Sequence, residues 1–479
     1  MKNEINNQIK KFIEDWAEQN KEEFHELTDF LWENPELGLE EYNAFEKITH
    51  ILKKHGFSIE TGTGGMPTAF VATYGSQGPV VGINVEYDCL PGLSQHKDVP
   101  YPSPVIEGAP AQGCGHNVLC GAAVMGGVAL RYAIEKFNLK ATVKMLGSPY
   151  EEASVGKPMI GREGVYKTVD FILDWHPWNY NRADYDACNS VFVLKFHFKG
   201  KTCHGAMPWL GGRSALDAGM LFAHALEMLR EHIEPNGPEA AHTINYTFSD
   251  VGAAFANIVP DKTSVQLYGR FKNMEISADA LRRITLCAEG IAMATETQVS
   301  REMITYTHNK IPNKPLAEVV HNNFKHYGTP EFTEEEQNFV KEMQKYMEME
   351  PVGLDTTLKD CGPSETIICD TSEFSWNAPY ATFWVTMGPA GGWHNWMITA
   401  CAGNSIGKKT LDKAVLIMSA SAIDVFLDPS ILDAAKADWK ERMAGREYQC
   451  LLPEDHLPPL GINSAEMDKY FPNRKRSVG

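Results

Sequence analysis

Residues of metal-binding types occur at several separate points of this sequence, and two of them share one short segment. Cys114 and His116 belong to the segment CysGlyHis, just before a helix that is rich in small residues. A thiolate and an imidazole at this spacing can both reach one metal ion from a loop. An isolated tripeptide of this kind is more often structural, so other ligands along the chain decide what it means.

Two adjacent glutamates, Glu151 and Glu152, follow the expected strand 142–147. Neighbouring carboxylates at the end of a strand point to different sides of a cleft, so one can bind a metal ion while the other stays free as a base. Glutamate pairs are abundant on protein surfaces. The position directly after an apolar strand, however, is where open α/β sheets place their active sites.

Two histidines extend this set. His176 ends an apolar strand in the segment AspTrpHisPro, and His394 lies in a glycine-rich turn after a strand that begins near residue 381. Each histidine alone is more often hydrogen-bonded than bound to a metal. A hydrolytic site with two metal ions needs several such ligands, one of them bridging. The sequence offers these candidates: Cys114, His116, Glu152, His176 and His394.

A further carboxylate, Asp88, lies in the segment GluTyrAspCysLeuPro, which follows the expected strand 79–85. Placed behind a metal ligand, it can accept a hydrogen bond and orient an imidazole. An aspartate that begins a turn explains the same segment equally well.

Another group of polar residues follows the change of pattern near residue 187. His204 comes just after a strand, Asn257 lies in AsnIleValPro before the next strand, and Arg270 ends that strand. A histidine, an amide and a guanidinium on one small domain can hold a carboxylate and stabilise an oxyanion. A lone arginine in a strand is more often a solvated edge residue.

The elements that must position these residues change character twice along the chain. Residues 1–186 alternate helices and strands, which predicts an α/β layered structure. Residues 187–308 follow the order strand, helix, strand, strand, helix, strand, which predicts an inserted ferredoxin-like α+β domain. Residues 309–479 return to the first pattern, and their proline-rich end is expected to run over the surface.

Length and composition limit the classes of function. A chain of 479 residues and 53.4 kDa is too long for one ordinary domain. A net charge of −18 argues against nucleic acid and anionic membranes as partners, and means that an anionic substrate needs a local positive site. We expect a cytoplasmic protein, because no signal peptide or membrane span is evident and the ten cysteines form no framework.

Taken together, these motifs resemble those of the M20 metallopeptidases. The matching features are CysGlyHisAsn, GluGlu about 37 residues later, HisPro about 24 residues after that, and a final histidine in a glycine-rich turn. Cysteine at the bridging position resembles the amidohydrolase branch, which includes hippurate and indole-acetyl amino-acid hydrolases. The segments LysThrCysHisGlyAlaMetProTrp and AsnIleValProAsp are similar to the lid and dimerisation domain of that family.

The resemblance implies a zinc-peptidase-like catalytic domain with a mixed sheet and two divalent ions, Mn²⁺ or Zn²⁺, in each subunit. It assigns Cys114 as the bridging ligand, with the four other candidates completing the two ligand shells. Glu151 would be the general base. His204 would reach the site of a neighbouring subunit in a homodimer or heterodimer, and Asn257 and Arg270 would hold the carboxylate of a small anionic substrate.

Shorter signatures near residues 86, 394 and 403 most resemble the p-aminobenzoyl-glutamate hydrolases within this branch, and they imply an aryl amide of glutamate as substrate. One alternative is a dipeptidase or a hydrolase of other N-acyl amino acids. Another is a non-catalytic subunit of a heteromeric hydrolase. One departure stands out, because the branch usually has ArgAlaAspMetAsp where this chain has AsnValGluTyrAsp. Glu86 is therefore either a group behind the ligands or an additional anion near the metals.

Overall fold

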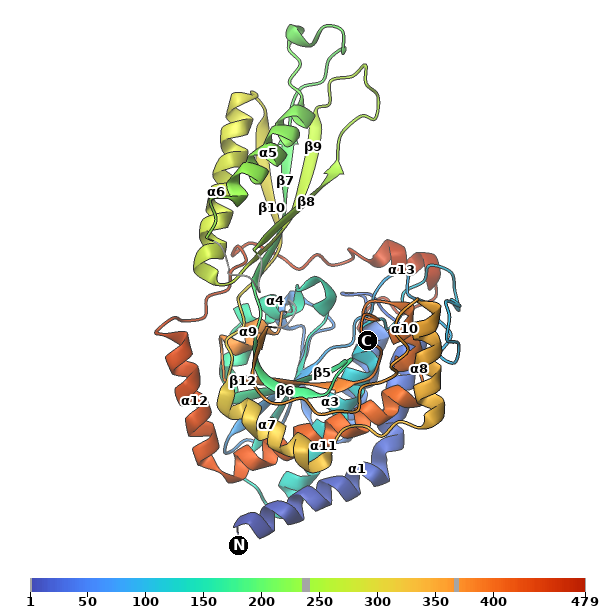
Figure 1. The fold of residues 1–479 in the computed structure, drawn as a ribbon. Coiled ribbons are helices and arrows are strands. Elements are labelled where there is room, and N and C mark those ends of the chain that lie inside the picture. Colours follow the sequence, from blue (N-terminus) through green and yellow to red (C-terminus); the bar gives the residue numbers. More distant parts are fainter. Residues whose placement is uncertain (1, 235–241, 366–369, 479) are drawn as a thin grey trace.

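The chain folds around two β-sheets, which Figure 1 shows in two separate parts of the molecule. We describe it from a computed structural model, in which residues 2–234, 242–365 and 370–478 are described. The larger sheet has eight strands in the order β1-β2-β4-β3-β5-β12-β6-β11, and the smaller has four in the order β10-β7-β9-β8. The larger sheet belongs to the two outer segments of the chain and the smaller to the segment between them.

The larger sheet is made of short strands that are separated by helices. Its strands are β1 (Ser58–Thr61), β2 (Phe70–Tyr74), β3 (Val80–Val85), β4 (Thr142–Gly147), β5 (Phe171–Trp178), β6 (Arg182–Ala187), β11 (Pro363–Glu365) and β12 (Tyr380–Thr386). The accompanying helices are α1 (Lys2–Glu33), α2 (Tyr42–Lys54), α3 (His116–Phe137), α4 (Gly156–Arg162), α7 (Lys314–Tyr327), α8 (Glu334–Tyr346), α9 (Ser372–Ser375), α10 (Trp396–Ala402), α11 (Ser405–Leu427), α12 (Pro429–Met443) and α13 (Ser464–Tyr470).

Both parallel and antiparallel pairs occur in this sheet. Strands β4, β3, β5 and β12 run parallel at its centre, whereas β1, β2 and β6 join through antiparallel pairs. The central strands are buried on both faces, as parallel strands usually are, and every residue of β12 is buried. The predicted α/β fold with a mixed sheet is confirmed. The parallel centre brings four carboxyl ends to one edge.

Helix α3 forms the centre of the core together with α1 and α11. It is long and apolar enough to cross a membrane by length and composition, but 89% of its most apolar stretch is buried inside the protein. The sequence predicted no apolar run of this length, and the helix corrects that expectation. Its small residues explain the close packing, because a Cβ at Gly121 would lie 2.1 Å from the hydroxyl oxygen of Thr28 on α1.

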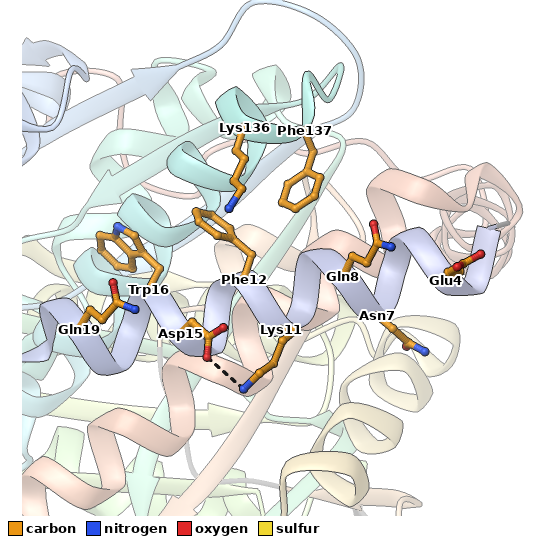
Figure 2. Close-up of a pocket in the computed structure, with 10 residues that line it drawn as sticks. All are labelled: Glu4, Asn7, Gln8, Lys11, Phe12, Asp15, Trp16, Gln19, Lys136 and Phe137. Atoms are coloured by element: carbon orange, nitrogen blue, oxygen red, sulfur yellow. Dashed lines mark ion pairs between the residues drawn. The ribbon is translucent and has the colours of Figure 1, made fainter.

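Helix α1 is amphipathic, and its aromatic side chains face the end of α3, as Figure 2 shows. The ring centroids of Phe12 and Phe137 lie 5.7 Å apart, and Lys136 lies 4.1 Å from the centre of the Phe12 ring. On the outer surface of α1, Lys11 and Asp15 form an exposed ion pair at 3.0 Å. This shallow groove is a packing feature of the two helices.

The smaller sheet carries two helices on one face. Its elements are β7 (Ser190–Lys199), α5 (Ala215–Arg230), β8 (Thr243–Asp250), β9 (Lys262–Phe271), α6 (Met274–Ala294) and β10 (Gln298–Thr307). All three strand pairs are antiparallel, and burial alternates along β9. This order of elements and strands is ferredoxin-like, which confirms the predicted class of the inserted lid.

The C-terminal tail runs along the surface of the larger part of the molecule and passes below the four-stranded sheet in Figure 1. Three of its side chains are buried, namely those of Tyr448, Leu452 and Met467. Arg162 of α4 donates a hydrogen bond to the carbonyl oxygen of His456 at 2.9 Å. The tail therefore adds a surface strap that ends near the short helix α13.

Candidate active site

Two of the predicted ligands are presented by the start of α3. Gly115, the residue between Cys114 and His116, has a φ of 82° and begins the helix. Glycine adopts this left-handed conformation without strain, and a Cβ here would lie 2.7 Å from the methyl carbon of Met387. The sharp turn at Gly115 therefore allows the thiol and the imidazole to face the same space.

The first group of ligands is formed by Cys114, His116 and His176. One ligand atom from each of them lies within 4.8 Å of the others, and Cys114 Sγ is 3.5 Å from His176 Nε2. His116 is fully buried, and its Nε2 has no hydrogen-bond partner among the described residues. A buried imidazole nitrogen without a partner is costly unless a ligand completes it.

The second group contains Cys114 again, together with Glu152 and His394. Their ligand atoms also lie within 4.8 Å of one another, and His394 Nε2 is 3.4 Å from Glu152 Oε2. His394 has a φ of 54°, which is uncommon for a residue with a side chain, and its backbone N–H donates to the carbonyl of Gly113. Because Cys114 belongs to both groups, its sulfur is placed where a bridging ligand must be.

Asp88 connects the two groups from behind. Its Oδ1 lies 3.0 Å from His116 Nδ1, and its Oδ2 accepts a hydrogen bond from the backbone N–H of Glu152 at 3.0 Å. A carboxylate on Nδ1 leaves Nε2 of the same ring free to face a metal ion. The structure thus places Asp88 where the sequence predicted a group that orients an imidazole.

The comparisons with known proteins agree with this geometry. Residues 82–398 match the peptidase family M20/M25/M40, and this range contains all the site residues described above. The chain belongs to this family. As an M20 protein it is a hydrolase of amide bonds, as the sequence predicted.

Several relatives of this M20 hydrolase have named activities. The chain is 28% identical to one of the subunits of p-aminobenzoyl-glutamate hydrolase from Escherichia coli, over 94% of its own length and 99% of that protein. It is 26% identical to the Xaa-Arg dipeptidase of Mus musculus, with 90% of each chain covered. The crystal structure of a dinuclear metal-binding M20 peptidase from Bacillus subtilis has the same fold, with a TM-score of 0.53 at 17% identity, covering 82% of this chain and 98% of that one.

The charge balance of the M20 site suits divalent cations. Glu151 and Glu152 are largely buried, and no lysine or arginine in the described part of the chain forms an ion pair with either. Burial raises the pKa of Glu152 to about 7, and burial together with the charges of Glu86 and Asp370 raises the pKa of Glu151. Burial also lowers the pKa of His176 to about 4, which keeps the imidazole in its neutral, metal-binding form.

Sequence reasoning missed a buried ion cluster behind the ligands. Lys157, fully buried in α4, donates hydrogen bonds of 2.6 Å to both Glu86 Oε1 and Asp370 Oδ1. The segment ValGlyLysProMet gives no sign of it, because its partners lie more than 70 residues away on either side. The cluster became visible only with the fold.

The ligands open into a cavity of about 180 Å³ with aromatic walls. Trp178, Trp384 and Trp393 line it on one side, and Tyr268 of the lid strand β9 also reaches it. The ring centroids of Trp178 and Trp393 lie 4.4 Å apart, and those of Trp178 and Trp384 lie 5.4 Å apart. These residues occur in or near the ligand motifs, but the sequence did not reveal that they form one surface.

The lid residues of the predicted set lie at opposite ends of β9. Asn257 Nδ2 is 3.5 Å from His204 Nε2, in the loops at the far end of the lid. Arg270 lies at the other end of the strand, beside Tyr268, with its guanidinium 3.9 Å from the centre of that ring. A strand of 10 residues separates these ends by about 30 Å. Within one chain, His204 and Asn257 therefore stay apart from Arg270.

Proposed function

We propose that this protein hydrolyses the amide bond between an aromatic acyl group and an amino acid, with p-aminobenzoyl-glutamate as its substrate. The observation that carries the proposal is the wall of tryptophans next to the metal-ligand groups. Flat aromatic side chains bind a flat aromatic ring through stacking and apolar burial. The relative from Escherichia coli, which aligns over nearly the whole chain and is named for this substrate, supports the same choice.

Two divalent ions fit the site by the chemistry of the donors. Cys114 would bridge them, His116 and His176 would complete one ligand set, and Glu152 and His394 the other. Such ions, manganese or zinc, would polarise the amide carbonyl and lower the pKa of water.

Glu151 is the proposed general base. Its side chain is 14% exposed and faces the same space as His116, with Oε2 of Glu151 at 3.6 Å from His116 Nε2. In this role its carboxylate takes a proton from the attacking water and returns it to the nitrogen of the leaving amino acid. A carboxyl whose pKa is raised by burial is suited to both transfers, because it holds the proton more firmly than an exposed glutamate does.

Arg270 is the proposed anchor for the carboxylate of the amino acid. It lies next to Tyr268, which lines the cavity, and its Nη1 donates a hydrogen bond to Asn245 Oδ1 at 2.9 Å. In a chain with a net charge of −18 a local guanidinium supplies the attraction that an anionic substrate needs.

His204 and Asn257 would act on the site of a second subunit, with His204 stabilising the oxyanion of the tetrahedral intermediate. We expect that mixing His204→Ala chains with Glu151→Ala chains restores part of the activity that each variant lacks. In a hybrid dimer, one site combines an intact Glu151 with an intact His204. Turnover is measured before and after subunit exchange, with each variant alone as the control. Absence of recovery in hybrids whose formation has been verified would show that His204 does not act across the interface.

The tryptophan wall makes a prediction about substrate choice. Trp178→Leu should lower kcat/KM for p-aminobenzoyl-glutamate by about tenfold, since stacking and aromatic burial contribute on the order of 1–1.5 kcal/mol. N-acetyl-glutamate, which has no ring to stack, serves as the matched substrate and should lose much less. Equal losses for both substrates would mean that Trp178 supports the site without contacting the acyl group.

The proposal is tested by measuring amino-acid release from a panel of substrates after loading with Mn²⁺ or Zn²⁺. The panel contains p-aminobenzoyl-glutamate, hippurate, an indole-acetyl amino acid, N-acetyl-glutamate and dipeptides that end in arginine. We expect the highest kcat/KM for p-aminobenzoyl-glutamate. A preference for dipeptides would favour the second candidate, a dipeptidase, which the coverage of the Xaa-Arg dipeptidase supports.

A non-catalytic subunit is the remaining alternative. The complete ligand set and the free carboxylate of Glu151 argue against it, because a subunit without activity does not need either. Turnover by the isolated chain would exclude it, whereas turnover only after addition of a related second chain would support a heteromeric enzyme.

A further inference from the structure

A third group of potential ligands lies beside the two described above. It consists of Glu86, His116 and Glu151, whose ligand atoms are all within 4.8 Å of one another. Glu86 Oε2 is 3.5 Å from His116 Nε2, and Glu151 Oε2 is 3.6 Å from the same nitrogen. That nitrogen is buried and has no hydrogen-bond partner in the part of the chain that the structure describes. An unpartnered imidazole nitrogen therefore faces both carboxylates.

The number of lone pairs decides how this group relates to the other two. His116 Nε2 has a single lone pair, so it can bind only one ion at a time. The same atom already belongs to the group with Cys114 and His176. The third group is therefore not an additional metal site. Its carboxylates can only add oxygen ligands to the ion that Cys114, His116 and His176 would hold.

Glu86 is the carboxylate that is fixed for this task. Its Oε1 accepts hydrogen bonds from Lys157 Nζ at 2.6 Å and from Asn84 Nδ2 at 2.7 Å. With Oε1 occupied in this way, Oε2 is left to face His116. The side chain of Glu151 makes no hydrogen bond to any of the described residues, which suits a base that must move a proton.

Lys157 is held as firmly as the carboxylate that it positions. Its Nζ donates to Asp370 Oδ1 at 2.6 Å, and its backbone N–H donates to Asp370 Oδ2 at 3.3 Å. Lys157 and Asp370 are both fully buried. Buried charges persist only when they are paired in this way, so the cluster keeps Glu86 in one place.

We propose that Glu86 is a direct ligand of the ion on the His116 side, with Lys157 as its positioning residue. This inference rests on the proposed two-metal function. It makes the two metal positions unequal. Four protein ligands would close the position on the His116 side, whereas Cys114, Glu152 and His394 leave an open place at the other. Closed positions are typical of tightly held ions, and open ones of ions that contact water or substrate. The side chain of His394 is 54% exposed, which agrees with an exchangeable ion there.

Metal titration of the apoprotein tests this inference without relying on activity. Zn²⁺ is added in competition with a chromophoric chelator, and the two dissociation constants are measured for each variant. In Glu86→Gln we expect the tighter step to weaken by about 10–100-fold, the scale seen when groups that support a metal site are removed. The weaker step should stay unchanged.

Asp174→Asn is the matched control, because Asp174 is a buried carboxylate of the same cavity and shares Asn84 as a partner, at 3.1 Å, but belongs to none of the ligand groups. It should leave both steps as in the wild type. Glu86→Asp keeps the charge for Lys157 but shortens the reach, so it should weaken the tighter step as well. This variant decides the question if Glu86→Gln does not fold.

The outcomes separate this inference from the function on which it rests. An unchanged tighter step in a folded Glu86 variant, or an equal loss in Asp174→Asn, would overturn the role of Glu86. Binding of fewer than two ions by the wild type would instead contradict the metal pair itself.

Discussion

Glu151→Gln should retain both metal ions and lose turnover by about 10²–10⁴-fold, the usual scale for a general base. The substitution keeps the size of the side chain but removes its ability to accept a proton. Glu151 makes no hydrogen bond through its side chain within the described structure, so little packing is at stake. Turnover is measured together with the metal content of the same sample.

The neighbouring residue provides the control for this experiment. Glu152→Gln removes a predicted ligand and should lose metal as well as activity, whereas Glu151→Gln should lose activity alone. Near-normal turnover in Glu151→Gln with both ions bound would refute its role as base. In the wild type, kcat/KM should fall as the pH drops through the pKa of Glu151, which burial raises above the ordinary glutamate value of 4.5, because only the ionised carboxylate can accept a proton.

Cys114→Ala should have the second large effect, namely loss of at least one ion and of nearly all activity. Its sulfur belongs to both ligand groups, so removing it weakens both positions. The variant should also unfold at a lower temperature in the presence of metal. An ion at a free concentration about 100 times its dissociation constant stabilises the folded state by about 2.7 kcal/mol, and this contribution disappears with the ion.

Cys120→Ala is the matched control for Cys114→Ala. Cys120 is also a buried thiol, further along α3, and it belongs to none of the ligand groups. It should keep both ions. Cys114→Asp is the informative partner, because a carboxylate can also bridge and favours manganese over softer ions. Two tightly bound ions in Cys114→Ala would contradict the bridging assignment.

The predicted metal ligands came together because each one marks the end of a local element. A ligand placed after a strand of a parallel sheet shares one edge with the ligands after its neighbours, so the sequence order alone brings Glu152 and His176 close to Cys114. The ferredoxin-like lid was predictable for a similar reason. Its order of strands and helices permits few arrangements, and the alternating burial of β9 is visible in the sequence.

Contacts between distant segments were not predictable. The ion cluster joins Lys157 on α4 to Glu86 after β3 and to Asp370 before α9, and no local pattern links these positions. The tryptophan wall likewise combines β5, β12 and the turn before α10. The sequence grouped Asn257 with Arg270 because both lie near β9, and only the direction of that strand shows that its length separates them.

The most direct test of the two-metal hydrolase is to measure metal content and turnover on the same purified protein. The account predicts two ions per chain and release of p-aminobenzoate and glutamate in equal amounts. Turnover should stop when a chelator removes the ions, and it should return when Mn²⁺ or Zn²⁺ is added back. Undiminished turnover by metal-free protein would contradict the account, as would two bound ions with no hydrolysis of any N-acyl amino acid or dipeptide.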